Sequence, residues 1–387
     1  MHSTAKNISS HDGPATAAMR KPRILIAAGG TGGHVYPAIA IADALREINR
    51  NSEILFVGTK NRMEWNAVPK AGYDIKNIWI SGLHRRMTVK NLLFPVKLIA
   101  SLVQSMNIIA AFRPHLVISC GGYVAGPVGW IASKRNIPLV IQEQNSFPGV
   151  TNRLLAKKAD IIFTAFKEAE GYLPREKVIL KGNPTRNTLT AVDKESAYRH
   201  FGFTKEQPTL LVLGGSGGAR VINEAMSQNI GQLHNELGLQ IIWQCGERYY
   251  DSLHTRLNTD GFERLRLVDF LHHMPEAYAA ADLVVSRAGA LSCSELELTG
   301  KPSILIPSPN VAGDHQTKNA RSMVEQGAAV LLEDAEAKSK LPHLVREVIF
   351  DRARLRKMSE AALQLARPAA AAEIAEEILE LIEVNKN

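Results

Sequence analysis

The chain has 387 residues, enough for two domains, and its 45% apolar and 22% charged residues are typical of a globular protein. This composition excludes intrinsic disorder, collagen and coiled coil for most of the chain. The three cysteines lie far apart and form no CxxC pair, which argues against a disulfide framework or zinc ribbon and favours a reducing compartment.

The charge is distributed unevenly between the two halves of the chain. Residues 1–186 contain 25 Lys and Arg against 11 Asp and Glu, a net charge of +14. Residues 187–387 contain 21 against 27, a net charge of −6. A basic half attracts anions, such as nucleic acid, anionic lipid or a phosphorylated substrate.

Ordered structure is expected to begin near Lys21. Residues 1–20 are polar and lack the apolar stretch of a signal peptide, so we interpret them as a disordered tail. A short apolar strand at 23–28 leads into the glycine-rich run 29–34, and a helix is expected over 35–49. Further strands separated by helical segments predict a parallel sheet covered on both faces. These strands are expected at 53–57, 115–120, 139–142, 161–164 and 178–180.

The same pattern begins again after residue 186. A strand at 209–213 ends in a second glycine-rich loop, 214–220, and a helix follows to about residue 237. Later strands are expected at 240–244, 266–268, 283–286 and 303–306. A helix over 369–384 follows Pro368. The sequence therefore predicts an α/β protein with two doubly wound parallel-sheet domains and a boundary near residue 186.

The two glycine loops suggest binding of phosphate. A glycine loop between a strand and a helix allows close approach of backbone N–H groups, and the helix dipole favours an anion. The simpler alternative is a tight turn that needs positive φ. Because two loops of this form occupy matching places in the two halves, we favour the anion site.

Several common phosphate motifs are missing from the sequence. There is no GxxxxGK[ST] loop. The dinucleotide fingerprint would require Gly or Ala where Val35 and Arg220 stand, and the following strands do not end in an acid. No Asp-x-Asp pair is available to hold a metal. A nicotinamide dehydrogenase and metal-dependent sugar transfer are therefore disfavoured.

Four polar features are candidates for chemistry. His34 ends the first glycine loop, and a neutral imidazole there could act as a general base. The polar run 142–145 follows a buried strand, where four polar residues rarely serve packing. Glu295 lies about one turn into a helix expected from Ala290 to Gly300 and could bind a sugar diol. The alternative is a capping arrangement, in which a serine side chain caps the helix and Glu295 interacts with the helix dipole. Asp314 is a candidate N-cap of a later helix, whose His315 and Gln316 are expected to face the cleft.

A basic and apolar stretch lies between the second and third predicted strands, 53–57 and 115–120. Residues 80–103 interleave apolar side chains with Arg and Lys, a pattern suited to an anionic lipid surface. The alternative is a basic loop before a core helix. Because residues 92–112 include Pro95, Lys97, Gln104 and Asn107, we do not expect them to span a membrane.

Six motifs in order carry a resemblance to a known family. They are GGTGGH (29–34), EQN (143–145), GNPTR (182–186), GGSGGAR (214–220), AGALSCSE (288–295) and DHQTKNA (314–320). From about Arg23 to the C-terminal helix, the chain resembles the MurG family of GT-B glycosyltransferases. Two positions depart from the commoner family residues: Gln142 stands where His is frequent, and Gly217 where Gln is frequent.

The resemblance implies a fold, a reaction and a set of donor contacts. It implies two Rossmann-like domains facing a cleft: residues 21–186 for the acceptor and the membrane, and 187–368 for UDP-GlcNAc. Residues 369–387 are expected to pack back on the N-terminal domain. The implied reaction is inverting, metal-independent transfer of GlcNAc to the C4 hydroxyl of MurNAc in lipid I, giving lipid II for peptidoglycan synthesis. The donor contacts carry over onto Thr31, Gly32, Gly33, Asn145, Arg186, Ser216, Leu271, Ala290, Leu291, Ser292, Cys293, Ser294, Glu295 and Gln316.

The resemblance also implies partners and a location. His34 is the candidate base, or it positions the acceptor diphosphate. Membrane contact is expected at Arg85, Arg86, Lys90, Phe94 and Lys97. The implied partners are UDP-GlcNAc, lipid I, an anionic membrane surface and other cell-wall synthesis proteins, with no nucleic acid and no cofactor. The implied place is the cytoplasmic face of the bacterial inner membrane, held peripherally, with roles in cell shape and division.

Three other functions stay open at this point. A GT-B glycosyltransferase with another glycolipid acceptor would share the donor half. A sugar-nucleotide epimerase would share the architecture without needing the basic apolar stretch. A non-catalytic scaffold that binds a nucleotide sugar at the membrane would also retain the donor motifs.

Overall fold

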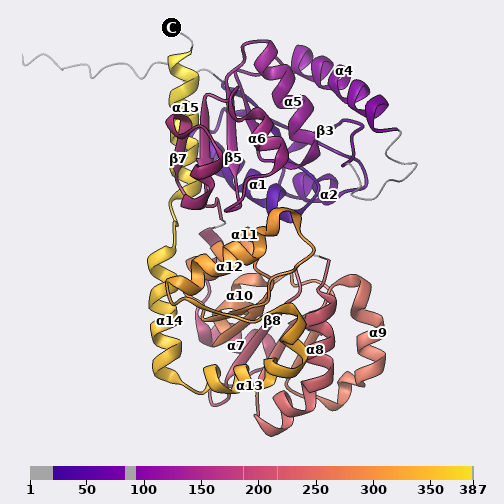
Figure 1. The fold of residues 1–387 in the computed structure, drawn as a ribbon, viewed down its shortest axis with the longest axis vertical. Coiled ribbons are helices and arrows are strands. Elements are labelled where there is room, and N and C mark those ends of the chain that lie inside the picture. Colours follow the sequence, from indigo (N-terminus) through magenta and orange to yellow (C-terminus); the bar gives the residue numbers. More distant parts are fainter. Residues whose placement is uncertain (1–20, 83–92, 186, 216, 386–387) are drawn as a thin grey trace, which may run out of the picture.

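The computed structural model describes residues 21–82, 93–185, 187–215 and 217–385. It consists of two α/β lobes stacked along the long axis of the molecule (Figure 1). The predicted tail 1–20 and the basic positions Arg85, Arg86 and Lys90 lie outside the described residues, as do Arg186 and Ser216.

The N-terminal lobe is built on a parallel sheet of seven described strands in the order β3-β2-β1-β4-β5-β6-β7. The strands are β1 (Arg23–Ala27), β2 (Glu53–Gly58), β3 (Asp74–Asn77), β4 (Leu116–Ser119), β5 (Leu139–Glu143), β6 (Ile161–Thr164) and β7 (Val178–Leu180). The helices are α1 (Gly32–Ile48), α2 (Met63–Lys70), α4 (Phe94–Phe112), α5 (Gly122–Lys134) and α6 (Val150–Ala156).

Alternation along the strands determines which helices cover each face of this sheet. Ile24 and Ile26 of β1 belong to one buried cluster, with side chains of α1 and of the C-terminal helix. Leu25 and Ala27 belong to another, with side chains of α4, α5 and α6. Successive strand residues point to opposite faces, so a wholly apolar strand requires a helical layer on each side.

The C-terminal lobe repeats this design with six described strands in the order β10-β9-β8-β11-β12-β13. The strands are β8 (Thr209–Leu213), β9 (Gln240–Gln244), β10 (Leu265–Val268), β11 (Leu283–Ser286), β12 (Ser303–Leu305) and β13 (Ala329–Leu331). The helices are α7 (Lys194–Phe201), α8 (Arg220–Gly231), α9 (Glu247–Leu257), α10 (Met274–Ala280), α11 (Ala290–Leu298), α12 (His315–Glu325), α13 (Ala337–Ile349) and α14 (Arg352–Leu365).

Both sheets reverse their strand order beside their first strand, at β1/β4 and at β8/β11. In open α/β sheets, ligands bind outside the carboxyl ends of the strands at such a switch point. The predicted fold class, two doubly wound parallel-sheet domains, is confirmed. The short strands β3 and β13 were not predicted.

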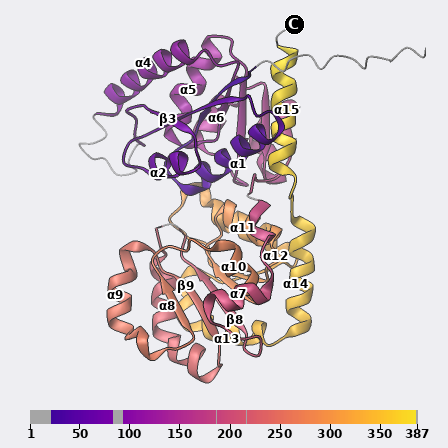
Figure 2. The same cartoon turned by 180° about the vertical axis from the view of Figure 1, so that it is seen from behind.

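The C-terminal helix returns to the first lobe. The chain runs along the C-terminal lobe in α14, and α15 (Ala370–Val384) then packs against α1. Both views show α15 beside the N-terminal sheet (Figures 1 and 2). Ile374 and Ile378 are fully buried in the same cluster as Ile24 and Ile26. The N-terminal core is therefore completed by residues from the far end of the chain.

Helix α4 corrects one expectation from the sequence. We did not expect residues 92–112 to be able to span a membrane, yet Phe94–Phe112 is long and apolar enough by length and composition alone. Lys97 is its one charged residue, and Pro95 lies in the first turn, where proline is tolerated. Only Ser101, Ser105 and Ile109 are buried, and the helix packs along α5 at the outer edge of the lobe (Figure 1).

The dependence of the N-terminal core on α15 can be tested by truncating a buried side chain. Ile378→Ala should lower the free energy of unfolding by about 2–5 kcal/mol, because it leaves a cavity between α15 and α1. Val384→Ala, at a position 71% exposed in the same helix, is the matched control and should change it by less than about 0.5 kcal/mol. Urea unfolding measures both. Equal effects of the two variants would contradict the packing described.

Candidate functional site

The first glycine loop lies directly against the loop that follows β4. Gly121 and Gly122 have φ of +94° and +79°, and a Cβ on Gly122 would come within 2.2 Å of the Gly29 carbonyl oxygen. Only glycine allows this approach. A Cβ on Gly121 would similarly meet the ring of His34 at 2.9 Å. The two loops at the switch point of the N-terminal sheet therefore form one surface around His34.

The glycine loop is shorter than predicted, because α1 begins at Gly32 rather than at residue 35. Thr31 occupies the N-cap position with extended backbone, and its side chain makes no capping hydrogen bond. His34 consequently lies in the first turn of α1. Gly32 is buried and Gly33 is half-buried, so the N-terminus of the helix approaches the surface only around Thr31 and Gly33.

A buried carboxylate holds the first glycine loop in place. Glu64 of α2 is fully buried and accepts a hydrogen bond from the Gly30 N–H at 3.1 Å. Its other oxygen accepts from the backbone N–H and the hydroxyl of Thr59 at 3.1 and 2.7 Å. A buried charge is tolerated when its oxygens are hydrogen-bonded in this way. Sequence reasoning missed Glu64, although an acid in the first turn of a short helix was the available signal.

Gln144 determines which nitrogen of His34 carries a proton. The Gln144 side-chain amide donates to the carbonyl oxygens of Cys120 and Gln142, at 2.8 and 3.1 Å, which leaves its oxygen Oε1 facing His34. Oε1 lies 2.8 Å from His34 Nδ1. An amide oxygen can only accept, so Nδ1 is the donor, and in the neutral ring Nε2 carries the lone pair. Nε2 is thereby available to take a proton from a bound hydroxyl.

The rest of the polar run 142–145 supports this geometry. Glu143 is buried, and its carboxylate accepts from the backbone N–H groups of Asn145 and Gly149 and from the Asn152 amide. Asn145 is half-buried, and its amide also donates to Glu143, at 3.3 Å. Gln142, which departs from the commoner family residue, is buried and donates to Asn183 at 3.3 Å. The hydrogen bonds of this run therefore hold the shape of the loop after β5, in addition to placing Gln144 against His34.

In the C-terminal lobe, Glu295 is held by a buried tyrosine. Tyr278 of α10 donates from its hydroxyl to Glu295 Oε2 at 2.9 Å. Burial and then the neighbouring carboxylate raise the pKa of Tyr278 well above its ordinary value, so the phenol remains a proton donor. Glu295 is half-buried, one turn into α11, which starts at Ala290 as predicted but ends at Leu298. The side-chain N-cap considered as the alternative is absent, because Gly289 is the N-cap.

The remaining predicted donor residues of this lobe differ in exposure. Cys293 and Leu271 are buried, so near Leu271 only the backbone can meet a ligand. Gln316 accepts from the Ser308 N–H at 2.8 Å and holds the loop before α12. Asp314 is the N-cap residue of α12 as predicted, but its side chain makes no capping hydrogen bond to the backbone: its φ is a left-handed 53°, and its carboxylate accepts from the Thr317 hydroxyl at 2.7 Å. Gly217 is exposed, and no atom would contact a Cβ added there.

The two lobes touch through the loop after β5 and helix α12. Asn319 of α12 is fully buried, and its Oδ1 accepts from the Ser146 hydroxyl at 2.8 Å. Its amide donates to the Ala288 carbonyl, just before α11, at 3.2 Å. Lys318 Nζ lies 4.2 Å from the centre of the Phe147 ring. The loop that orients His34 is therefore joined, through the Asn319 side chain, to the segment that precedes α11.

Metal-ligating side chains cluster elsewhere. Within the described ranges, His200, His273 and Glu276 have ligand atoms within 4.8 Å of one another, at half-exposed or exposed positions. None of the three belongs to the predicted donor set. The predicted site itself offers a hydrogen-bonded imidazole on one lobe and a helix N-terminus on the other, which suits transfer of a group away from an anionic leaving group.

Comparison with known proteins identifies relatives over nearly the whole chain. Residues 24–164 match the glycosyltransferase family 28 N-terminal domain, and residues 209–378 match the glycosyltransferase family 28 C-terminal domain. A UDP-N-acetylglucosamine–N-acetylmuramyl-(pentapeptide) pyrophosphoryl-undecaprenol N-acetylglucosamine transferase of Flavobacterium psychrophilum is 45% identical over 95% of this chain and 100% of its own length. Its namesake in Salinibacter ruber is 47% identical over 94% of this chain and 97% of its own length.

A solved structure supports the same relationship. The crystal structure of Acinetobacter baumannii MurG is 27% identical to this chain, with a TM-score of 0.71. The match covers 94% of this chain and 99% of that one.

Proposed function

The chain belongs to the MurG family of glycosyltransferases within family 28, and from this premise we propose that it transfers GlcNAc from UDP-GlcNAc to lipid I. The acceptor atom is the C4 hydroxyl of the MurNAc unit of undecaprenyl-pyrophosphoryl-MurNAc-pentapeptide. The products are UDP and lipid II, the precursor of peptidoglycan. One observation carries the proposal: identity of 45% with a transferase of this name extends through both lobes.

A transfer assay tests this function directly. Purified protein with labelled UDP-GlcNAc and a lipid I analogue should release UDP and move the label to the lipid product. Omission of the lipid should abolish label transfer. A protein that consumes UDP-GlcNAc without an acceptor, or interconverts it with an epimer, would refute the proposal.

For the donor, we propose binding at the N-terminus of α11. The free N–H groups of the first turn and the helix dipole favour the diphosphate, and Ser292 adds a hydroxyl there. Glu295, oriented by Tyr278, binds the ribose hydroxyls, and the backbone near Leu271 contacts uracil. Arg186 and Ser216 complete the predicted set from outside the described residues. On the N-terminal side, Thr31, Gly32, Gly33 and Asn145 approach the sugar and its phosphate.

For the chemistry, we propose a single displacement that inverts the anomeric carbon. His34 Nε2 takes the proton of the acceptor hydroxyl, the oxygen bonds to C1 of GlcNAc, and the bond from C1 to the diphosphate breaks. The electron pair leaves with UDP, whose added charge is met by the α11 N-terminus. The hydrogen bond from Nδ1 to Gln144 holds the ring while Nε2 is protonated.

For the location, we propose peripheral binding at the cytoplasmic face of the inner membrane. Exposed apolar side chains recur at helical spacing on α4, between 39% and 64% exposed, which supports an apolar stripe. They are Val96, Ile99, Val103 and Met106. Lys97 and Phe94, with Arg85, Arg86 and Lys90, add the basic and apolar contacts predicted from the sequence. From the family, we also propose other cell-wall synthesis proteins as partners and roles in cell shape and division.

The donor role of Glu295 predicts a specific loss of affinity. Glu295→Ala should weaken UDP binding roughly 5- to 150-fold, since a charged hydrogen-bonded group contributes about 1–3 kcal/mol. Calorimetric titration with UDP measures this, and Glu236→Ala, at an exposed position of the same lobe, is the control. Unchanged affinity in folded Glu295→Ala protein would rule out the ribose contact.

The base role of His34 predicts a loss in rate rather than in donor binding. His34→Ala should reduce kcat by on the order of 10²–10⁴ while UDP-GlcNAc affinity is retained. The exposed His254 of α9 provides the control substitution. A raised acceptor KM with kcat preserved would instead indicate that His34 positions the acceptor diphosphate. A kcat within about tenfold of wild type would exclude the base.

Transfer is also expected to need no metal. Because helix dipoles and cationic side chains meet the diphosphate in this proposal, activity should be the same in EDTA and in magnesium. Loss of transfer in EDTA that magnesium restores would contradict it, and a metal-dependent glycosyltransferase assayed alongside controls for effective chelation.

Membrane binding should depend on the basic side chains near α4. Reversal to Glu should weaken binding to anionic vesicles by about 1 kcal/mol per residue at low salt, and less as salt screens the surface. The reversed residues are Arg85, Arg86, Lys90 and Lys97. The control reverses three exposed basic residues of α14, Arg352, Arg356 and Lys357. Co-sedimentation measures both, and equal binding of the two variants would argue against this surface.

A further inference from the structure

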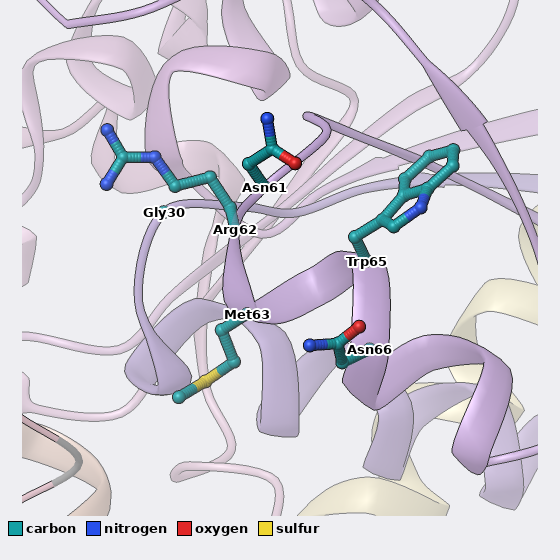
Figure 3. A pocket seen from close by; sticks show the side chains of 6 residues that line it. All are labelled: Gly30, Asn61, Arg62, Met63, Trp65 and Asn66. Atoms are coloured by element: carbon teal, nitrogen blue, oxygen red, sulfur yellow. The ribbon is translucent and has the colours of Figure 1, made fainter. Parts of the chain in front are cut away.

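A cavity of about 480 Å³ lies beside the first glycine loop in the N-terminal lobe. It is lined by Gly30, Asn61, Arg62, Met63, Trp65 and Asn66, from the β1–α1 loop, the β2–α2 loop and the first turns of α2 (Figure 3). Neither the predicted site residues nor the proposed chemistry uses Arg62, Trp65 or the two asparagines. The cavity is therefore a concave surface next to the site without an assigned ligand.

The lining combines a cation, amides and an aromatic ring. The Arg62 side chain is exposed and forms no ion pair among the residues that the structure describes. Asn61 and Asn66 supply amide groups, and Lys60 Nζ lies 6.0 Å from the Trp65 ring centre. A guanidinium binds carboxylate or phosphate through two parallel hydrogen bonds, and amides can pair with peptide groups.

The nearby carboxylate does not neutralise Arg62. Both oxygens of Glu64 are occupied by hydrogen bonds to Gly30 and Thr59 on the buried side of α2. Arg62 and Lys60, which lies beside Trp65, are two cations against this one buried carboxylate, so the formal charge of these groups around the cavity is positive. Gly30 has a φ of +95°, and a Cβ added to it would meet no atom within 4 Å. The wall of the cavity at Gly30 is therefore open space.

The position of the cavity relates it to the acceptor. Gly30 and His34 belong to one loop-to-helix segment, so the cavity adjoins the place where the reacting hydroxyl is proposed to lie. In a muramyl sugar the peptide is attached through the lactyl ether at C3, next to the C4 hydroxyl, and the diphosphate is at C1. An acceptor with C4 at His34 must extend its charged substituents into neighbouring surfaces of this lobe.

We propose that this cavity binds an anionic group of the muramyl-peptide acceptor, with Arg62 as its counterion. The inference rests on the proposed function. The acceptor carries such groups in two places, the carboxylates of its peptide and its diphosphate. Arg62 is a binding residue in this proposal and takes no part in proton transfer.

Kinetics with two acceptors test the proposal. One is a short-chain lipid I analogue with its pentapeptide, and the other is the same molecule without the peptide. Arg62→Ala should raise the acceptor KM roughly 10- to 100-fold, with kcat and UDP-GlcNAc affinity unchanged. An effect confined to the peptide-bearing acceptor assigns the peptide carboxylates, and an equal effect on both assigns the diphosphate.

Controls separate this proposal from general damage. Arg50→Ala removes an exposed arginine elsewhere in the same lobe and should leave KM unchanged. Arg62→Lys, which keeps the charge but loses the paired hydrogen bonds, should fall between wild type and Arg62→Ala. Unchanged KM for both acceptors in Arg62→Ala overturns the proposal.

Equilibrium titration keeps the result independent of turnover. Soluble N-acetylmuramyl-pentapeptide and inorganic diphosphate are titrated separately into wild-type and Arg62→Ala protein. At least one probe should bind wild type and bind the variant roughly tenfold or more weakly. If wild type transfers no GlcNAc yet shows this difference, the proposed function fails and the cavity assignment stands. If transfer occurs but neither probe distinguishes the proteins, the cavity assignment fails alone.

Discussion

The hydrogen bonds of Gln144 are the constraint on which the geometry of the site depends. Two backbone carbonyls, of Cys120 and Gln142, fix the direction of the amide, and the amide in turn fixes the tautomer of His34. Cys120 follows β4 and Gln142 belongs to β5, so the His34 ring is oriented by adjacent strands of one sheet. Because the strands of a sheet are rigid, they fix the orientation of the His34 ring more precisely than a glycine loop alone could.

The contact between the lobes connects this constraint to the donor side. Asn319 joins Ser146, two residues after Gln144, to Ala288, two residues before α11. The segment before α11 follows the switch-point strand β11, and the loop of Ser146 follows β5, the neighbour of the switch-point strand β4. The chain also crosses between the lobes twice, because α15 returns to complete the N-terminal core. The loop after β5 and the segment before α11 are therefore linked by one short chain of buried hydrogen bonds, and the two lobes by two covalent crossings.

Much of the two-lobed fold could be predicted from the sequence, because the repeated strand–glycine loop–helix pattern has a local physical cause. The polar run 142–145 was also conspicuous in the sequence, since buried strands rarely end in four polar residues, and its Gln144 contacts His34. The role of Gln144 could not be predicted, because it depends on carbonyl groups of separate strands. Glu64 was missed for the same reason: its partners, Gly30 and Thr59, meet only after folding. Strands β3 and β13 were missed because they lack a long apolar run. The apolar length of helix α4 was underestimated, because its one charged residue and its early proline do little to interrupt it.

A double-mutant cycle on kcat for GlcNAc transfer tests most directly whether Gln144 acts through His34. The four proteins are wild type, Gln144→Leu, His34→Ala and the double variant, each checked for folding by its melting temperature. The account predicts that Gln144→Leu lowers kcat by at least about tenfold with UDP-GlcNAc affinity retained, and adds almost nothing in the His34→Ala background. Independent, multiplicative losses, or a normal kcat in Gln144→Leu, would contradict it.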